Sequence, residues 1–219
     1  MTIKICFAGV LIYLLSFTCS ANDWRLSAED LDIKVYSRAV PESKLNQIRA
    51  ESIVDADISK LAIIMGDIES FSEWMFACLE SKVIDHKNGM DFKFYYVHES
   101  PWPYKNRDVI LQITTLDELD SGQFRVVINS IESSFVSSSD LVRMSSMRGS
   151  WLFQKISDST TKVDFELFVD PAGNVPTAFV NSGNIKVVLE SFKGLMRIAN
   201  NQAYVKAIKD KELKQLEKA

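Results

Sequence analysis

The sequence predicts an α+β domain in which a large curved antiparallel sheet is covered on one face by a long C-terminal helix. Two observations carry this prediction. Residues 79–169 form a series of strand-like segments with short connections, as consecutive antiparallel strands do. After residue 176, apolar side chains recur at helical spacing. A sheet of this size needs cover on one face, and only the C-terminal helix is long enough to supply much of it.

The N-terminal part of the domain is expected to hold two strands and a helix. Residues 31–37 alternate apolar and polar side chains, and residues 45–54 form a second strand candidate. Asp57 is in the position of a helix N-cap, because apolar residues follow it at helical spacing from Ile58 to Ile68. Residues 71–74 are expected to add a short further turn of helix.

The middle of the chain is predicted to be all strand. Turn signals separate several of the segments, among them residues 87–89 and 120–122, which both contain glycine. The predicted strands are residues 79–85, 91–98, 109–116, 124–133, 141–144, 149–156 and 162–169.

Residues 170–176, Asp-Pro-Ala-Gly-Asn-Val-Pro, are predicted to turn the chain from the last strand into the long helix. Pro176 suits the first helical turn, where its missing N–H would be unpaired in any case. Asn174 is the expected cap. The helix is predicted over residues 176–209, and it would run about 50 Å if unbroken. Gly183 and Gly194 weaken it and mark either a bend or a close packing contact.

Residues 1–21 have the pattern of a secretory signal peptide. Lys4 precedes an apolar run over residues 5–17, and small residues follow at Cys19 and Ala21. The alternative is an uncleaved membrane anchor, although the run is short for a span, which needs about 20 residues. Cleavage after Ala21 would leave residues 22–219 as a single domain and place the protein outside the cytoplasm, in a bacterial periplasm.

Charge and cysteine content narrow the function classes. The chain has 25 Lys and Arg against 29 Asp and Glu, and removal of Lys4 would leave 24 against 29. A mildly acidic protein without a basic cluster is a poor candidate for binding nucleic acid. The mature chain would keep only Cys78, so no internal disulfide is possible. Cys78 lies in an apolar stretch and is expected to be buried and inert.

No motif in the sequence predicts catalysis, a metal site or a cofactor. His86 and His98 are the only histidines, and neither has the spacing of a metal ligand. The sequence lacks a Gly-x-Ser-x-Gly elbow and a glycine-rich phosphate loop.

The chain resembles the START domain family, the steroidogenic acute regulatory protein-related lipid-transfer domains of the helix-grip superfamily. The resemblance covers nearly all of the mature chain, and the segments occur in the family's order. They are residues 32–38, 53–57 with the helix leading to Trp74, 101–108, 149–151 and 170–176. The resemblance implies a helix-grip fold with an internal hydrophobic tunnel. The tunnel would bind one lipid or sterol, and the C-terminal helix would be part of its lid.

The resemblance also suggests where polar groups enter the tunnel. In sterol-carrying members an acidic residue and a later arginine place charge inside it. Glu99 matches the acid, but Ile113 stands where the arginine would be. This departure counts against a sterol pocket of that type and leaves fatty acid, phospholipid and other apolar ligands open.

Two features near residue 105 have a structural and a functional interpretation. Arg107 and Asp108, with Asn106, either fix the turn through hydrogen bonds to backbone and to each other, which we favour, or contact a ligand. Trp102 either touches a membrane or gates the tunnel mouth, or it packs the turn onto the sheet.

The final helix carries a wide apolar stripe. Trp74 and Trp151 are expected in the core, and so are most residues of such a stripe, but some must line a tunnel if one exists. Phe192 and Met196 are the preferred candidates, because methionine adapts to irregular ligands. The stripe comprises Phe179, Ile185, Val188, Leu189, Phe192 and Met196.

The leading hypothesis is a non-enzymatic, extracytoplasmic protein that binds or transfers a lipid, with transient contact to a membrane surface. One alternative is an enzyme of the same architecture, using His86 or His98 with an acid and a serine in the tunnel. Another is a solid-cored interaction domain of the cell envelope.

Overall fold

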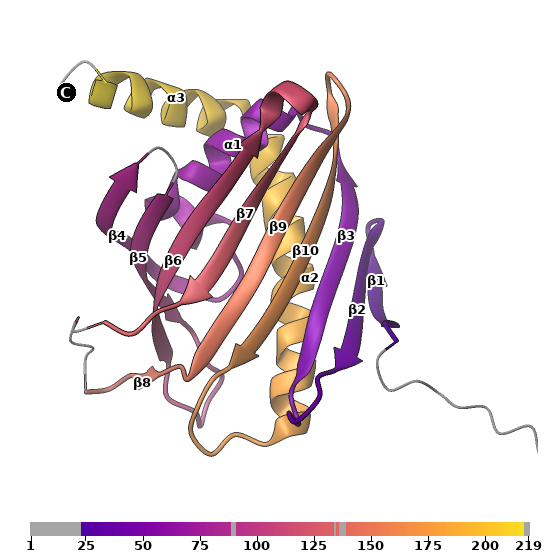
Figure 1. Cartoon of the computed structure of the whole chain (residues 1–219), viewed down its shortest axis with the longest axis vertical. Coiled ribbons are helices and arrows are strands. Elements are labelled where there is room, and N and C mark those ends of the chain that lie inside the picture. Colours follow the sequence, from indigo (N-terminus) through magenta and orange to yellow (C-terminus); the bar gives the residue numbers. More distant parts are fainter. Residues whose placement is uncertain (1–22, 89–90, 134, 136–138, 217–219) are drawn as a thin grey trace, which may run out of the picture.

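The computed structural model describes residues 23–88, 91–133, 135 and 139–216. The predicted signal peptide lies outside these residues. Within them, ten strands form one sheet (Figure 1). The strands are β1 (Arg25–Asp30), β2 (Ile33–Ala39), β3 (Asn46–Val54), β4 (Cys78–Asn88), β5 (Asp91–His98), β6 (Arg107–Glu118), β7 (Gln123–Ser130), β8 (Val142–Arg143), β9 (Ser146–Ser157) and β10 (Thr160–Asp170).

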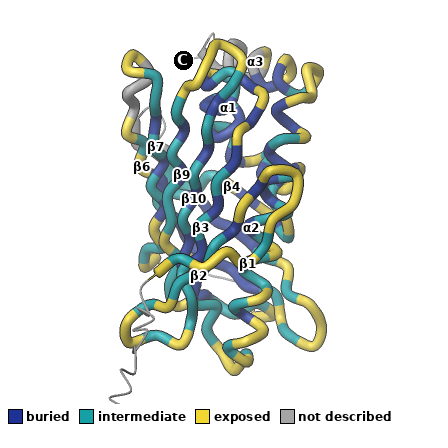
Figure 2. Tube along the Cα trace, turned by 90° about the vertical axis from the view of Figure 1, so that its right-hand side faces the viewer, coloured by how far each residue is buried: buried dark blue, intermediate teal, exposed yellow. Residues whose placement is uncertain are grey.

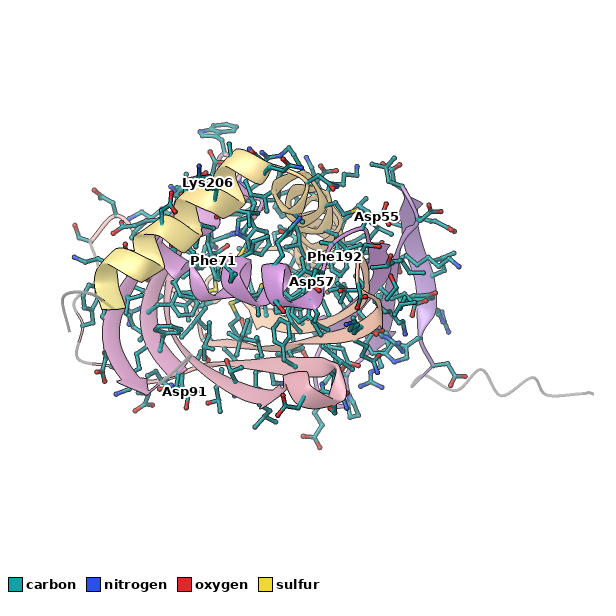
Figure 3. The ribbon with its side chains drawn as sticks, turned by 90° about the horizontal axis from the view of Figure 1, so that it is seen from above. Asp55, Asp57, Phe71, Asp91, Phe192 and Lys206 are labelled. Carbon is teal, nitrogen blue, oxygen red and sulfur yellow. The ribbon has the colours of Figure 1, made fainter. Side chains whose placement is uncertain are left out.

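The sheet follows the order β1-β2-β3-β10-β9-β7-β6-β5-β4, and each neighbouring pair on this path is antiparallel. The short β8 pairs in parallel with β6 at one end. The sheet curves around the helices, with α2 (Thr177–Ala199) lying along its concave face (Figures 1 and 3). The predicted α+β helix-grip architecture is therefore confirmed.

Alternation along the strands divides core from surface. On β5, Phe94 and Tyr96 face the helices and belong to the main core, whereas Tyr95 and Val97 form a small cluster on the opposite face. Buried residues accordingly line the interface between sheet and helices, and exposed residues gather in the loops at the two ends (Figure 2). Trp74, Trp151 and Cys78 are all buried in the core, as predicted. Burial raises the pKa of the Cys78 thiol to about 11.

The helix after β3 begins as the sequence predicts. Asp57 is the N-cap of α1 (Ile58–Gly66), and its carboxylate accepts a hydrogen bond of 2.8 Å from the Ser59 backbone N–H. A 3-10 turn, η1 (Ile68–Glu73), follows and supplies Phe71 to the core. Phe71 and Phe192 both lie inside the curve of the sheet in Figure 3. Strand β1, by contrast, was missed because it is short and mostly exposed, with Leu26 and Ala28 as its only apolar residues.

The prediction of one helix over residues 176–209 is wrong. The chain breaks at Asn200 and Asn201, and α3 (Gln202–Leu216) crosses the end of the fold that holds α1 (Figure 1). The Asn200 side chain donates to the Met196 carbonyl, and the Asn201 side chain accepts from the Tyr204 N–H. Asparagine side chains compete with the helical hydrogen bonds in this way and end one helix while capping the next.

The start of α2 also differs from the prediction. Its N-cap is Pro176, with extended backbone and no side-chain cap bond, so Asn174 is not the cap. The Pro176 carbonyl accepts from the N–H groups of Phe179 and Val180. Ala172 and Gly173 before it have positive φ angles of 56° and 72°, which turn the chain sharply at the end of β10.

Neither glycine of α2 marks the break. A Cβ on Gly194 would lie 1.9 Å from the Trp74 carbonyl oxygen, so this glycine marks a close packing contact. A Cβ on Gly183 would have nothing within 4 Å. Among the described residues, no helix combines the length and apolar character needed to cross a membrane.

Candidate hydrophobic ligand site

A cavity of about 370 Å³ lies between α2 and the sheet. It occupies the end of the fold where β10 joins α2, opposite α1 and α3 (Figure 1). Its walls are the first half of α2, the turn between β5 and β6, the start of β9 and the end of β10. Most of its surface is apolar, with contributions from Phe76, Tyr96, Met144, Met147, Leu167 and Val187.

On α2, a glycine lies where the helix borders the cavity. Phe179, Gly183 and Val187 are spaced four residues apart and all line the cavity. A larger side chain at position 183 would project into the empty space.

Beyond the cavity, aromatic rings fill the space under α2. Trp151 stacks on Phe165 and Phe192 with ring centroids 4.0 Å and 5.3 Å away, and Trp74 meets Trp151 edge-on. Gly194 lets α2 approach the Trp74 backbone here. The second half of α2 therefore covers a solid core, and the first half covers a hollow one.

The candidate site residues predicted from the sequence fall on both sides of this division, some on the cavity wall and some outside it. Glu99, Arg107 and Phe179 line the cavity. Trp102 does not line it, but its neighbours Pro101 and Tyr104 do. The other members of the stripe are absent from the wall, and two of them, Val188 and Phe192, are buried in the solid core. The stripe residues outside the wall are Ile185, Val188, Leu189, Phe192 and Met196.

Several lining residues were not predicted from the sequence. Tyr96 and His98 follow Phe94 on the inward face of β5, so strict alternation could have assigned them. Met144 and Met147 lie beside β8, in a region where the pattern is irregular. Val187 is one helical turn beyond Gly183, but no pattern in the sequence shows that the space there is empty.

Arg107 fixes the turn before β6, in agreement with the structural interpretation favoured from the sequence. Its guanidinium donates to the carbonyls of Lys105 and Pro171 and to the Ser100 hydroxyl. The bond to Pro171 ties this turn to the chain that leads into α2. Asn106 contributes as well, because its side chain accepts a 2.9 Å hydrogen bond from the Ser100 N–H.

Arg107 and Asp108 do not pair with each other. Successive strand residues point to opposite faces, so Arg107 faces the cavity and Asp108 faces outward. Asp108 is fully buried there and accepts two hydrogen bonds from Arg143, at 3.1 and 2.9 Å.

The rim of the cavity is polar. His98 and Arg107 are cross-strand neighbours, and Glu99, Ser100 and Lys186 lie along the same opening. Burial and, to a smaller degree, the positive charge of Arg107 together lower the pKa of His98 to about 4. His98 is therefore neutral at physiological pH.

The depressed pKa of His98 predicts an acid-dependent loss of stability. As the pH falls from about 6.5 to 4, His98 becomes protonated in the unfolded chain, whereas its imidazole stays largely neutral in the folded protein. Relative to a His98→Gln variant, the wild type is expected to lose about 3 kcal/mol more unfolding free energy between pH 7 and pH 4. Urea unfolding across this range measures the difference. Parallel pH profiles would contradict the burial of a neutral imidazole.

The cavity shows no paired nucleophile and base. Among the described residues, no hydrogen bond joins His98 to Ser100 or Glu99, and the Ser100 hydroxyl accepts from Arg107 instead. A covalent mechanism needs a nucleophile within hydrogen-bond reach of its base. The other histidine named by the enzyme hypothesis, His86, has a side chain outside the described residues. In the part of the chain that the structure covers, no group of three or more potential ligands could hold a metal ion.

A curved sheet gripping a helix around an apolar cavity defines a class of proteins built to enclose a hydrophobic molecule. The sequence pattern of the START domain matches residues 12–204. The chain therefore belongs to the START domain family.

Relatives and solved structures agree with this assignment. An uncharacterised protein of Pseudomonas aeruginosa is 26% identical over 182 residues, which cover 83% of this chain and 89% of that protein. Mouse START domain-containing protein 10 is 27% identical over 76% of this chain, and the match spans only 58% of the mouse protein. The crystal structure of human STARD10 superposes with a TM-score of 0.76 at 22% identity, covering 88% of this chain and 78% of that one. A STAR-related lipid transfer protein of Xanthomonas axonopodis gives a TM-score of 0.74 at 22% identity, covering 81% and 99%.

Proposed function

We propose that this protein binds one lipid in the cavity under α2 and transfers it without chemical change. The observation that carries the proposal is the empty apolar space of about 370 Å³ beneath the first half of α2. Each methylene moved from water into such a space contributes about 0.8 kcal/mol. A chain of several methylenes is therefore held without strong polar contacts, and the fold needs no catalytic group for this task.

Exchange requires the mouth of the cavity to open. Tyr104, on the β5–β6 turn, packs against Phe179 in the first turn of α2, with ring centroids 5.3 Å apart. Both residues line the cavity, and Phe179 is also partly exposed. Separation of these two rings would give a lipid a path out, in the manner of a lid.

Membrane contact is proposed through the same turn. The Trp102 side chain is 92% exposed between two prolines, so it does not pack the turn onto the sheet. Tryptophan favours the membrane–water interface. An exposed tryptophan beside the opening would bring the cavity to the lipid surface.

Replacement of Trp102 by alanine is expected to weaken binding to phospholipid vesicles by about tenfold, because burial of a large apolar side chain contributes about 1.5–3 kcal/mol. Vesicle flotation measures the change. Ile156→Ala is the matched control, since Ile156 is also exposed but lies at the far end of β9. Equal losses in both variants would contradict the role of this turn.

The compartment is proposed from the sequence of residues 1–21. We infer that this segment is cleaved after Ala21 and that the protein works outside the cytoplasm, in a bacterial periplasm. N-terminal sequencing of the exported protein should begin at Asn22. A membrane-bound protein that still begins at Met1 would contradict cleavage.

Binding and transfer are tested in two steps. The neutral fluorophore N-phenylnaphthylamine should bind with a blue-shifted, enhanced emission and a stoichiometry near one. The loaded protein should then carry fluorescent lipid from donor to acceptor vesicles. Failure to bind the fluorophore or any lipid would refute the proposal, and binding without transfer would restrict it to storage or sensing.

A further inference from the structure

Arg107 places a buried positive charge on the wall of the cavity. Arg107 is only 5% exposed, although arginine is almost never fully buried without a charged partner. Alternation along β6 explains the position, since Val109 and Leu111 follow it on the inward face and belong to the core. The inward row of β5 likewise ends in a polar residue, His98, directly opposite Arg107.

The partners of Arg107 in this structure are all uncharged. They are two backbone carbonyls and one hydroxyl, bound through Nε and Nη1, and the Tyr104 ring, whose centroid lies 5.9 Å from Cζ. Among the described residues no carboxylate forms an ion pair with Arg107, and no hydrogen bond leaves its Nη2. A guanidinium has five N–H donors, so donors remain for another acceptor. Burial lowers the pKa of Arg107, which is the sign of a cation that its surroundings do not neutralise.

The neighbouring charges do not remove this excess. Lys186 lines the same cavity, with its Nζ 5.3 Å from the centre of the Phe76 ring, and adds a second cation. Glu99 and Lys186 are both exposed to solvent, where water and salt screen their charges. His98 is neutral. The described groups around the cavity therefore leave a positive site at one end and an apolar wall elsewhere.

The size of the cavity limits the apolar part of a ligand. If a methylene is taken to be about as large as a water molecule, about 30 Å³, then about 370 Å³ holds about 12 methylenes. That volume corresponds to about one acyl chain.

We propose that the cavity binds a single-chain acidic amphiphile, with its carboxylate or phosphate head on Arg107 and its chain along Gly183 and Val187. This assignment rests on the proposed function and names the class of lipid. The planar guanidinium matches carboxylate and phosphate oxygens, and an anion would supply the counter-charge that the protein lacks. Lys186 would add long-range attraction at the opening.

The test compares ligands that differ only in the head group. Dodecanoate, dodecyl phosphate and dodecanol are titrated against the wild type, by displacement of N-phenylnaphthylamine below their aggregation limits. Both acids are expected to bind about tenfold to hundredfold more tightly than the alcohol. The free energy of a hydrogen bond to a charged group corresponds to a ratio of affinities of this size. The tighter of the two acids identifies the natural head as carboxylate or phosphate.

Variants then test whether Arg107 supplies the positive charge that the acids recognise. Arg107→Gln keeps amide donors for the carbonyls, and it should bring both acids to the affinity that the same variant has for dodecanol. Arg107→Lys should restore part of the preference for acids. Arg125→Gln is the matched control, because Arg125 lies on the solvent side of the sheet, outside the cavity wall.

The outcomes separate the two proposals. Equal affinity of the wild type for acid and alcohol would overturn the acidic head but leave a hydrophobic carrier. A preference for acids that survives in Arg107→Gln would overturn the assignment to Arg107. Tighter binding of a two-chain phosphatidic acid than of dodecyl phosphate would overturn the single-chain limit. Binding of none of these ligands would overturn the proposed function itself. Should Arg107→Gln fail to fold, the wild-type ratio and Arg107→Lys decide the matter.

Discussion

Gly194→Ala is expected to destabilise the protein by about 4 kcal/mol or more, or to prevent folding. The added Cβ would lie 1.9 Å from the Trp74 carbonyl oxygen and 2.9 Å from its carbonyl carbon. Both are backbone atoms, so no side-chain rotation relieves the overlap, and α2 must move away from the core. That movement would also disturb the stacking of Phe192 on Trp151. Urea unfolding followed by circular dichroism measures the loss.

Gly183→Ala is the matched control on the same helix. Its Cβ would meet nothing within 4 Å, and alanine is favoured over glycine in a helix by about 0.5–1 kcal/mol. This variant should therefore be slightly more stable than the wild type. Equal effects of alanine at the two positions would contradict the division of α2 into a half over a solid core and a half over a cavity.

Gly183→Leu is expected to weaken binding of N-phenylnaphthylamine and of lipids by about tenfold or more. Leucine projects its side chain into the open space, and overpacking a filled site costs about 1–3 kcal/mol, which corresponds to this loss. The fold should remain intact, because leucine is a good helix former and the space around position 183 is empty. Fluorescence titration measures the affinity, and the melting temperature reports on folding.

Ser182→Leu provides the comparison for this binding experiment. Ser182 precedes Gly183 on α2 but is exposed and is not part of the cavity wall. The Ser182→Leu variant adds the same leucine side chain on the outer face of α2, so lipid binding should persist. If Gly183→Leu binds as well as Ser182→Leu does, the ligand does not occupy the space under α2.

The sequence predicted most of the fold because its local patterns are strong. Asp57 caps α1, the inward and outward residues of β5 alternate, and the Asp170–Pro176 segment joins β10 to α2. The break at Asn200 and Asn201 was missed because apolar spacing continues through it, whereas the break depends on side-chain hydrogen bonds. The exposed strand β1 was missed because its alternation is short and contains only two apolar residues, Leu26 and Ala28.

The site was less accessible from sequence. Periodicity identified an apolar stripe on α2, but Phe192 covers solid core while Phe179 lines the cavity. The two positions have the same chemistry, and only the packing opposite each one distinguishes them. Gly183 and Gly194 likewise have the same residue type and opposite surroundings. Arg107 could be placed at the start of a strand, but its lack of a charged partner follows only from three-dimensional contacts.

Native mass spectrometry of the purified protein tests the central claim, that the space under α2 holds a hydrophobic molecule. Protein isolated under mild conditions without detergent should show a bound species with the mass of one lipid, released on solvent extraction. Gly183→Leu should lose this species, and Ser182→Leu should retain it. A wild-type protein that is folded, free of any bound molecule and still empty after incubation with lipid would contradict the claim.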